Sequence, residues 1–286
     1  MPVLPASLIE PLWVEFAALI GTESRRPGFH PSHPLGCHRR RVADRVVFDC
    51  VIAALVHGSG FERVAVPGCS DRTIRRRLAV WAERGVTRDL LRTALASYDR
   101  MLGLDLDDLS VDGSITKSPC GGEVSGRSPV DRGKQGTKRS VVTDGAGLPL
   151  HLVPAPANAH DSPLLEPTLA GVPDAIGPLP DGACVHLDAG YDSAKTRDLL
   201  HILGYRHQIA TKGKPSPIQV GKRWVVERTH SWMNGYGKLR RSTDKQRPVV
   251  EFFLFLAAAI TVIRRLINTA RYHYRWDQRP TTRRLK

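Results

Sequence analysis

The chain has 286 residues, of which 41% are hydrophobic and 24% are charged, an ordinary composition for a folded protein of one large domain or two small ones. The formal net charge of +14 indicates a polyanionic partner, with nucleic acid favoured over an anionic membrane surface. Five cysteines without a Cys-x-x-Cys pair argue against a disulfide framework. No signal peptide is recognisable, and the longest apolar run, 252–263, is shorter than the roughly 20 residues of a membrane-spanning helix. These features predict a cytoplasmic protein.

Helical spacing dominates the first hundred residues. Apolar residues recur with helical period over 7–21, with Ser7 at a capping position, and again over about 43–57. The basic stretch between them is rich in Pro and Gly, which indicates a loop. Its histidines and cysteine could be drawn as a metal cluster, but their spacing matches no common zinc pattern; they are His30, His33, Cys37 and His38.

A third helix is expected over about 71–81, with Ser70 or Asp71 as its N-cap. Ile74, Leu78 and Trp81 share one face of that helix, and a group of arginines lies off it. A helix, a short turn and an arginine-faced helix form the outline of a helix-turn-helix, whose second helix enters the DNA major groove. The plainer alternative is a solvated basic face. The arginines are Arg72, Arg75, Arg76 and Arg77, and a further helix is expected over 88–102.

From residue 104 the pattern changes to mixed strands and helices. The Asp144-Gly145 pair between two apolar runs is the strongest short-range signal of a β-hairpin. A basic loop over 115–138 precedes that hairpin, and Asp161 or Ser162 is expected to cap the helix that follows it. The expected elements, in order, are strand 106–112, strands 139–143 and 148–153, helix 162–169, strand 185–188, helix 195–203, strand 206–210 and helix 223–232.

Three carboxylates stand out in this order of elements. Asp112 and Asp188 each end a short apolar run that leads into a glycine turn, at Gly113 and Gly190, and Glu227 lies on a predicted helix. The order of strands and helices matches a ribonuclease H-like α/β fold, in which the first strand pairs with the fourth. Since that pairing would set the two aspartates side by side, we expect all three acids to converge. A lone aspartate, by contrast, is usually a turn or cap residue.

Converging carboxylates suit hard cations better than they suit general acid–base chemistry. Mg²⁺ prefers oxygen ligands, and two such ions about 3.5–4 Å apart support in-line phosphoryl displacement. In this hypothesis Asp112 bridges two Mg²⁺ ions, for which Mn²⁺ can substitute, while Asp188 and Glu227 each hold one side. His230 and the tryptophans Trp224 and Trp232 flank Glu227, with packing or base stacking open for the tryptophans.

The C-terminal region begins with a strongly apolar helix over 249–268, which we interpret as a buried core helix. The tail after it is basic and carries Tyr272, Tyr274 and Trp276. It is either a nucleic-acid contact or a solvated end.

Several motifs together resemble bacterial insertion-sequence transposases of the DDE type, in the insertion sequence four/five superfamily. They are Ser110-Val111-Asp112-Gly113-Ser114, Pro156-Ala157-Asn158-Ala159-His160-Asp161-Ser162, Asp188-Ala189-Gly190-Tyr191-Asp192 and Trp224-Val225-Val226-Glu227-Arg228-Thr229-His230-Ser231-Trp232. The resemblance covers about 106–241. It implies a ribonuclease H-like catalytic domain, Mg²⁺, and strand cleavage and transfer at terminal inverted repeats by a homo-oligomer on DNA. The catalytic acids of the family match Asp112, Asp188 and Glu227.

The resemblance also has departures. The family often carries Tyr, Arg and Lys at fixed positions around its glutamate. Arg223 fits, but Val220 and Asn234 stand at the Tyr and Lys positions. The DNA-phosphate contacts are therefore assigned more broadly, to Arg223, Arg228, Lys238, Arg240 and Arg241 in addition to the four arginines of the third helix.

The predicted organisation is a helical DNA-binding domain over 1–104, a catalytic domain over 105–245 and a C-terminal helix and tail over 246–286. Two other functions remain open: a nuclease on the same fold that hydrolyses without joining, and a transposase-derived DNA-binding protein without catalysis. The complete set of acids disfavours the second.

Overall fold

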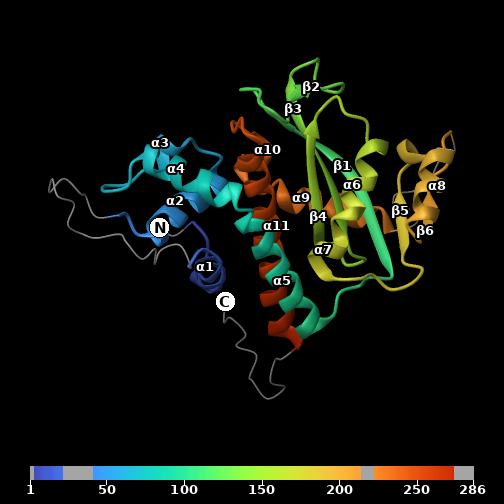
Figure 1. The fold of residues 1–286 in the computed structure, drawn as a ribbon, viewed down its shortest axis with the longest axis horizontal. Coiled ribbons are helices and arrows are strands. Elements are labelled where there is room, and N and C mark those ends of the chain that lie inside the picture. Colours follow the sequence, from blue (N-terminus) through green and yellow to red (C-terminus); the bar gives the residue numbers. More distant parts are fainter. Residues whose placement is uncertain (1–2, 22–40, 214–221, 274–286) are drawn as a thin grey trace, which may run out of the picture.

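A computed structural model describes residues 3–21, 41–213 and 222–273. A group of helices lies beside a mixed β-sheet, and two long helices, α5 and α11, run between them (Figure 1). The histidine and cysteine cluster at 30–38 and the tail from Tyr274 lie outside the described residues. The described cysteines are free, as predicted: Cys50, Cys69, Cys120 and Cys184.

The first five helices confirm the predicted helical N-terminal region, with differences in detail. Ser70 caps α4, and its hydroxyl oxygen accepts a hydrogen bond from the Thr73 amide at 3.3 Å. The predicted cap at Ser7 is wrong, because α1 begins one residue earlier and Pro5 stands at its N-cap. An additional helix, α3, replaces the expected short turn before α4. The helices are α1 (Ala6–Ile20), α2 (Asp44–His57), α3 (Phe61–Val64), α4 (Asp71–Glu83) and α5 (Val86–Leu102).

The sheet combines an antiparallel half with a parallel half. Strand β3 pairs antiparallel with both β1 and β4, whereas β5 pairs parallel with β1 and with β6. The two-residue β2 is added to the start of β3. The strands are β1 (Asp108–Lys117), β2 (Gly126–Arg127), β3 (Gln135–Thr143), β4 (Pro149–Pro156), β5 (Cys184–Leu187) and β6 (Arg206–Ile209).

This strand order, β4-β3-β1-β5-β6, confirms the ribonuclease H-like arrangement. β1, β3 and β4 form two successive antiparallel pairs, and β5, the next strand along the chain, pairs parallel with β1. The helices that connect and cover the sheet are α6 (Ser162–Ala170), α7 (Val172–Ile176), α8 (Ala194–Ile202), α9 (Trp224–Met233) and α10 (Gly237–Arg240). The short 3₁₀ turn η1 (Ala189–Tyr191) follows β5 directly.

Strand lengths in the antiparallel half were underestimated. Strand β1 does not end at Asp112 but continues to Lys117, and β3 begins at Gln135. The first and last residues of the loop predicted over 115–138 therefore belong to these two strands. The residues by which β1 and β3 exceed the predicted strands show little alternation of polar and apolar side chains. Because helices cover both faces of this part of the sheet, β3 is buried along almost its whole length, and the period-two pattern that marks a half-exposed strand is absent.

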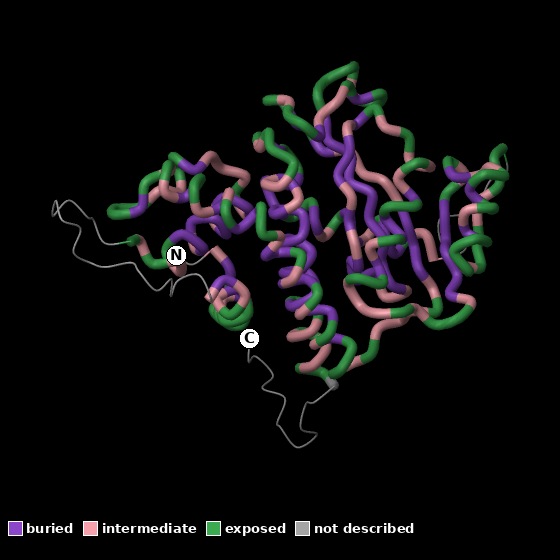
Figure 2. Tube along the Cα trace, viewed as in Figure 1, coloured by how far each residue is buried: buried purple, intermediate pink, exposed green. Residues whose placement is uncertain are grey.

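Helix α11 (Arg247–His273) is the central element of the hydrophobic core, as predicted. It packs against α5, α4 and α1 on one side and against β4 on the other, so one continuous core joins the helices to the sheet. Figure 2 shows this helix and the central strands as the most buried parts of the chain. A helix that is apolar on all sides is stable only when surrounded. Among the described helices, none combines the length and apolar character needed to cross a membrane.

Candidate catalytic carboxylates and basic surface

The pairing of β1 with β5 brings two of the predicted acids together. In the parallel ladder Ser110 is paired with His186, and Asp112 and Asp188 each lie two residues further along their strands. Asp112 is within β1 but stands where its pairing with β5 has ended. Asp188 immediately follows β5, and its Oδ1 accepts a hydrogen bond from the Gly190 amide at 2.8 Å. The two aspartates are therefore neighbours at one edge of the sheet.

Helix α9 brings the third acid to the same region. It packs on β1 and β3, and His230 directs Nε2 toward Asp112 Oδ2 at 3.5 Å. Glu227 lies one helical turn before His230, and residues at this spacing share one side of a helix. Glu227 is exposed on that side. The hairpin turn after β3 fixes the helix, since Arg228 donates to the carbonyl of Ala146 at 2.6 Å and Thr229 donates to that of Gly147.

The electrostatics of Asp188 reflect this crowding of negative charge. Its pKa is raised, first by partial burial and then by repulsion from Asp112 and Asp161, and hydrogen bonds from the backbone amides of Gly190 and Tyr191 oppose the rise. A cation held between these carboxylates would lower the pKa of Asp188 instead.

The surroundings of the acids fit a divalent cation. Tyr191 is 1% exposed and its hydroxyl has no hydrogen-bond partner, and neither ring nitrogen of the buried His230 has one. Buried polar groups nearly always have partners, so these atoms match a site completed by an ion and its waters. Carboxylate oxygens are the ligands that hard cations prefer. Asp112, Asp188 and Glu227 are the residues that could hold such ions.

Four residues of this region were missed or misjudged from sequence. Asp161 was expected to cap α6, but its side chain makes no cap hydrogen bond and pairs instead with Lys138 Nζ at 2.9 Å. Tyr191 and Arg139 carried no distinguishing signal. His230, which flanks Glu227 in the sequence, is buried beside Asp112. Only the tertiary fold places these residues near the acids.

The arginines of α4 do not act as one set. Arg72, Arg75 and Arg76 are exposed, with Arg75 paired to Asp71 and Glu62 and stacked on the Phe61 ring. Arg77 instead turns inward and forms an ion pair with Asp44, with only 14% of its side chain exposed. Arg77 therefore packs against α2 and is not presented to DNA.

The basic residues around α9 and α10 likewise differ in availability. Arg228 lies between the rings of Trp224 and Trp232, 4.5 and 4.8 Å from their centroids, so both tryptophans pack on this guanidinium. Arg223 is half-buried at the start of α9.

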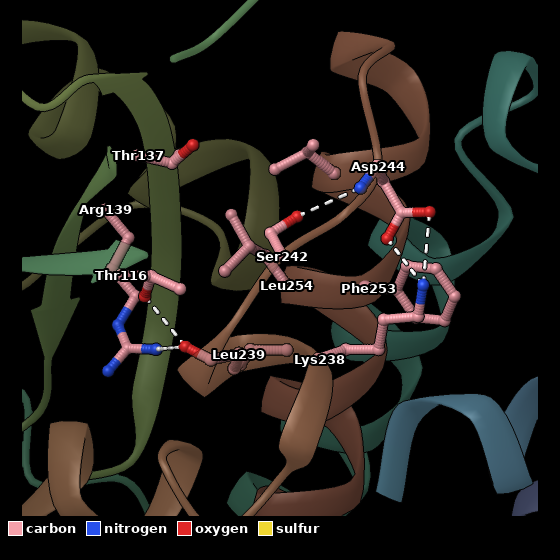
Figure 3. A pocket seen from close by; sticks show the side chains of 10 residues that line it. Thr116, Thr137, Arg139, Lys238, Leu239, Ser242, Asp244, Phe253 and Leu254 are labelled. Carbon is pink, nitrogen blue, oxygen red and sulfur yellow. Dashed lines mark hydrogen bonds and ion pairs between the residues drawn. The ribbon is translucent and has the colours of Figure 1, made fainter. Parts of the chain in front are cut away.

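Lys238 is buried, with Nζ 3.0 Å from Asp244 and within cation–π distance of Phe253 (Figure 3). Its Nζ is also within cation–π distance of Phe61. Arg240 and Arg241 are exposed, and Arg241 lines a cavity of about 450 Å³ together with Arg63 and Arg75. Residues far apart in sequence thus form one basic hollow between α4 and the segment after α10.

Comparison with known proteins identifies the family of the chain. Residues 104–262 match the family model described as "Transposase DDE domain". A protein of Burkholderia cepacia, described as "Putative transposase for insertion sequence element IS402", is 34% identical over 141 residues, which are 48% of this chain and 67% of that protein.

Solved structures with detectable similarity include the Mos1 mariner paired-end complex with Mn, with a TM-score of 0.35, 11% identity and coverage of 93% of this chain and 87% of that chain. The Mos1 strand transfer complex gives a TM-score of 0.32, 12% identity and coverage of 90% and 85%. These scores are too low to support residue assignments, so the fold assignment depends on the strand order itself. The matched family model covers more than half of the chain, including all three candidate acids, and the protein is therefore a member of the DDE transposase family.

Proposed function

We propose that Asp112, Asp188 and Glu227 are the catalytic carboxylates of this transposase and that together they hold two Mg²⁺ ions. The reaction would be cleavage and transfer of DNA strands at the terminal inverted repeats of an insertion sequence. The observation that carries the proposal is the β1–β5 register, which makes Asp112 and Asp188 neighbours, together with the His230 contact that sets α9 beside them.

Each residue would have a distinct part. Asp112, between β5 and α9, is the carboxylate that can face both cations, with Asp188 on one side of it and Glu227 on the other. When bound, the two cations supply activation of the attacking water or 3′-hydroxyl and stabilise the leaving oxygen of the displacement. His230 Nε2, which lies 3.5 Å from Asp112 Oδ2 and makes no hydrogen bond, sets α9 beside this carboxylate.

DNA contact is assigned to the exposed arginines of α4 and of the segment at the end of α10, of which Arg75 and Arg241 line the basic hollow. Arg72, Arg75 and Arg76 on α4 and Arg240 and Arg241 after the catalytic helix are accessible, and the net charge of +14 favours a polyanion. Assembly of two or more copies on paired transposon ends is part of the proposal. Action on chromosomal DNA implies a location in the bacterial cytoplasm, at the nucleoid.

The test is nicking and joining of a supercoiled plasmid that carries the gene with its native flanks, in Mg²⁺ or Mn²⁺. Wild type should cut at the flanks and join the released ends, whereas Asp188→Asn should bind the flanks without cutting them. Retained cutting by Asp188→Asn would refute the assignment of this carboxylate. Cutting without joined products would indicate a nuclease, and binding without cutting by the wild type would indicate a DNA-binding protein.

A matched pair of arginine variants tests the DNA surface. Arg76→Gln should weaken binding and reduce the salt dependence by roughly 0.9 log–log units for one lost phosphate contact. Arg77→Gln should leave that slope unchanged, because Arg77 is paired with Asp44. An unchanged slope in both variants would move the DNA contact away from α4.

A further inference from the structure

A fourth carboxylate lies against the strand that carries Asp112. Gly113 has no side chain, and a Cβ built at this position would collide with Oδ1 of Asp161. The Asp161 carboxylate thus occupies space next to β1 that any other residue at 113 would fill. Successive residues of a strand face opposite sides, so Asp161 approaches β1 from the side opposite the Asp112 side chain. Asp188, beyond the end of β5, is within electrostatic reach of both.

The position of Asp161 before α6 does not explain its orientation. An aspartate at the N-cap of a helix normally accepts a hydrogen bond from a backbone amide of the first turn, and Asp161 makes no such bond. Its Oδ1 instead faces Lys138 Nζ at 2.9 Å, and the Lys138 side chain is only 8% exposed. The protein therefore holds a buried ammonium group next to this acid, in place of a cap.

An independent observation at the same place points to a ligand. Tyr191 is 1% exposed, and its hydroxyl is buried without a hydrogen-bond partner. Burial raises the pKa of this hydroxyl, and the charges of Asp161, Asp112 and Asp188, in that order, raise it further. A buried hydroxyl without a partner, close enough to these three carboxylates to be affected by their charges, is a donor that a metal-bound water or a rearranged carboxylate would satisfy.

We infer that Asp161 is a fourth metal-binding carboxylate, which shares a divalent cation with Asp188 and is held by Lys138 until that cation binds. This inference rests on the proposed function, because it extends the same metal site. The Lys138 ammonium neutralises Asp161 in the metal-free protein. On metal binding Asp161 turns from Lys138 to the cation, and the hydroxyl of Tyr191 donates to a water or carboxylate of the completed site.

Manganese binding to the full chain, measured by calorimetry without DNA, tests the inference independently of activity. The informative comparison is Lys138→Met against the double variant Lys138→Met/Asp161→Asn, because neither protein contains an unpaired buried ammonium. If Asp161 is a ligand, the double variant should bind Mn²⁺ at least about tenfold more weakly than Lys138→Met, the lower end of the effect of altering a group beside metal ligands. If Asp161 serves only to neutralise Lys138, the two variants will bind equally and the inference is wrong.

Asp188→Asn separates this result from a failure of the proposed function. If Asp188→Asn binds Mn²⁺ more weakly while Lys138→Met and Lys138→Met/Asp161→Asn bind it equally, the site of three carboxylates is supported and Asp161 is not one of its ligands. Undiminished binding in all these variants would refute the site as a whole.

Direct ligation is distinguished from a long-range charge effect by Asp161→Cys. A cysteine ligand should bind Cd²⁺ with a thiolate-to-cadmium charge-transfer band. Wild type and Asp198→Cys, at an exposed position on α8, provide the background. A new band in Asp161→Cys alone supports ligation, and a band no larger than that of Asp198→Cys contradicts it.

Discussion

Arg139 provides a sharp test of how the catalytic helix is held, because it is a buried cation without an acidic partner among the described residues. It is 1% exposed, and its guanidinium donates to Asn234 Oδ1 at 2.6 Å, to the His230 carbonyl at 3.3 Å and to the Leu239 carbonyl at 3.5 Å. The last of these bonds is drawn in Figure 3 beside that of Thr116 to the same carbonyl. Arg139 thus ties the ends of α9 and α10 to β3.

Two opposing effects determine the result of replacing it. Burial lowers the pKa of Arg139 to about 10, from an ordinary value of about 12.5, so at roughly 1.4 kcal/mol per pKa unit the buried charge costs about 3.5 kcal/mol. Hydrogen bonds from a charged donor contribute about 1.5–3 kcal/mol each when short, and less when long. With one short and two long bonds, the loss should be about 4–5 kcal/mol. Arg139→Met should therefore be destabilised by only about 0.5–1.5 kcal/mol.

Arg139→Lys, the chemically closer substitution, should be less stable than Arg139→Met. Lysine keeps a charge in the same buried position but lacks the planar fork that reaches several acceptors at once. Urea unfolding at pH 7 measures both free energies. A lysine variant as stable as wild type, or clearly more stable than the methionine variant, would refute this account. Both variants should also lose strand cleavage, since the end of α9 is no longer anchored.

Three further outcomes follow from the structure. His151 has a pKa lowered to about 4, first by burial and then by Arg88, so the folded protein resists protonation that the unfolded chain accepts below about pH 6.5. Stability should therefore fall by about 3 kcal/mol as the pH drops from 6.5 to 4. His151→Gln should remove most of that loss in urea unfolding at the two pH values, and an unchanged pH dependence would contradict the assignment. Gly113→Ala should displace Asp161 and weaken Mn²⁺ binding in calorimetry relative to wild type; equal binding by the two proteins would argue against the close approach. Arg77→Gln should lower the unfolding free energy more than Arg76→Gln, because only Arg77 is held in a half-buried ion pair, and the opposite order would show that the Asp44 pair contributes little.

The sequence by itself determined the order and type of most elements. The Asp144-Gly145 turn, the cap at Ser70 and the short apolar run before Asp188 depend on local chemistry, and each is present in the structure. The element order also led to the β1–β5 pairing. Predictions were weaker where burial on both faces removes the alternation of polar and apolar residues. That is why β1 and β3 were predicted too short and part of both was assigned to a loop.

The tertiary structure decided which side chains share an environment. Nothing in the neighbourhood of Asp161 in the sequence distinguishes a helix cap from an acid pressed against Gly113, because the difference depends on a strand almost fifty residues earlier. Arg77 and Arg76 are adjacent in the sequence, yet one faces Asp44 on α2 and the other faces solvent. Periodicity along one element indicates the direction of a side chain relative to its own helix or strand. What that side chain meets is determined by the packing of other elements, and local spacing carries no information about it.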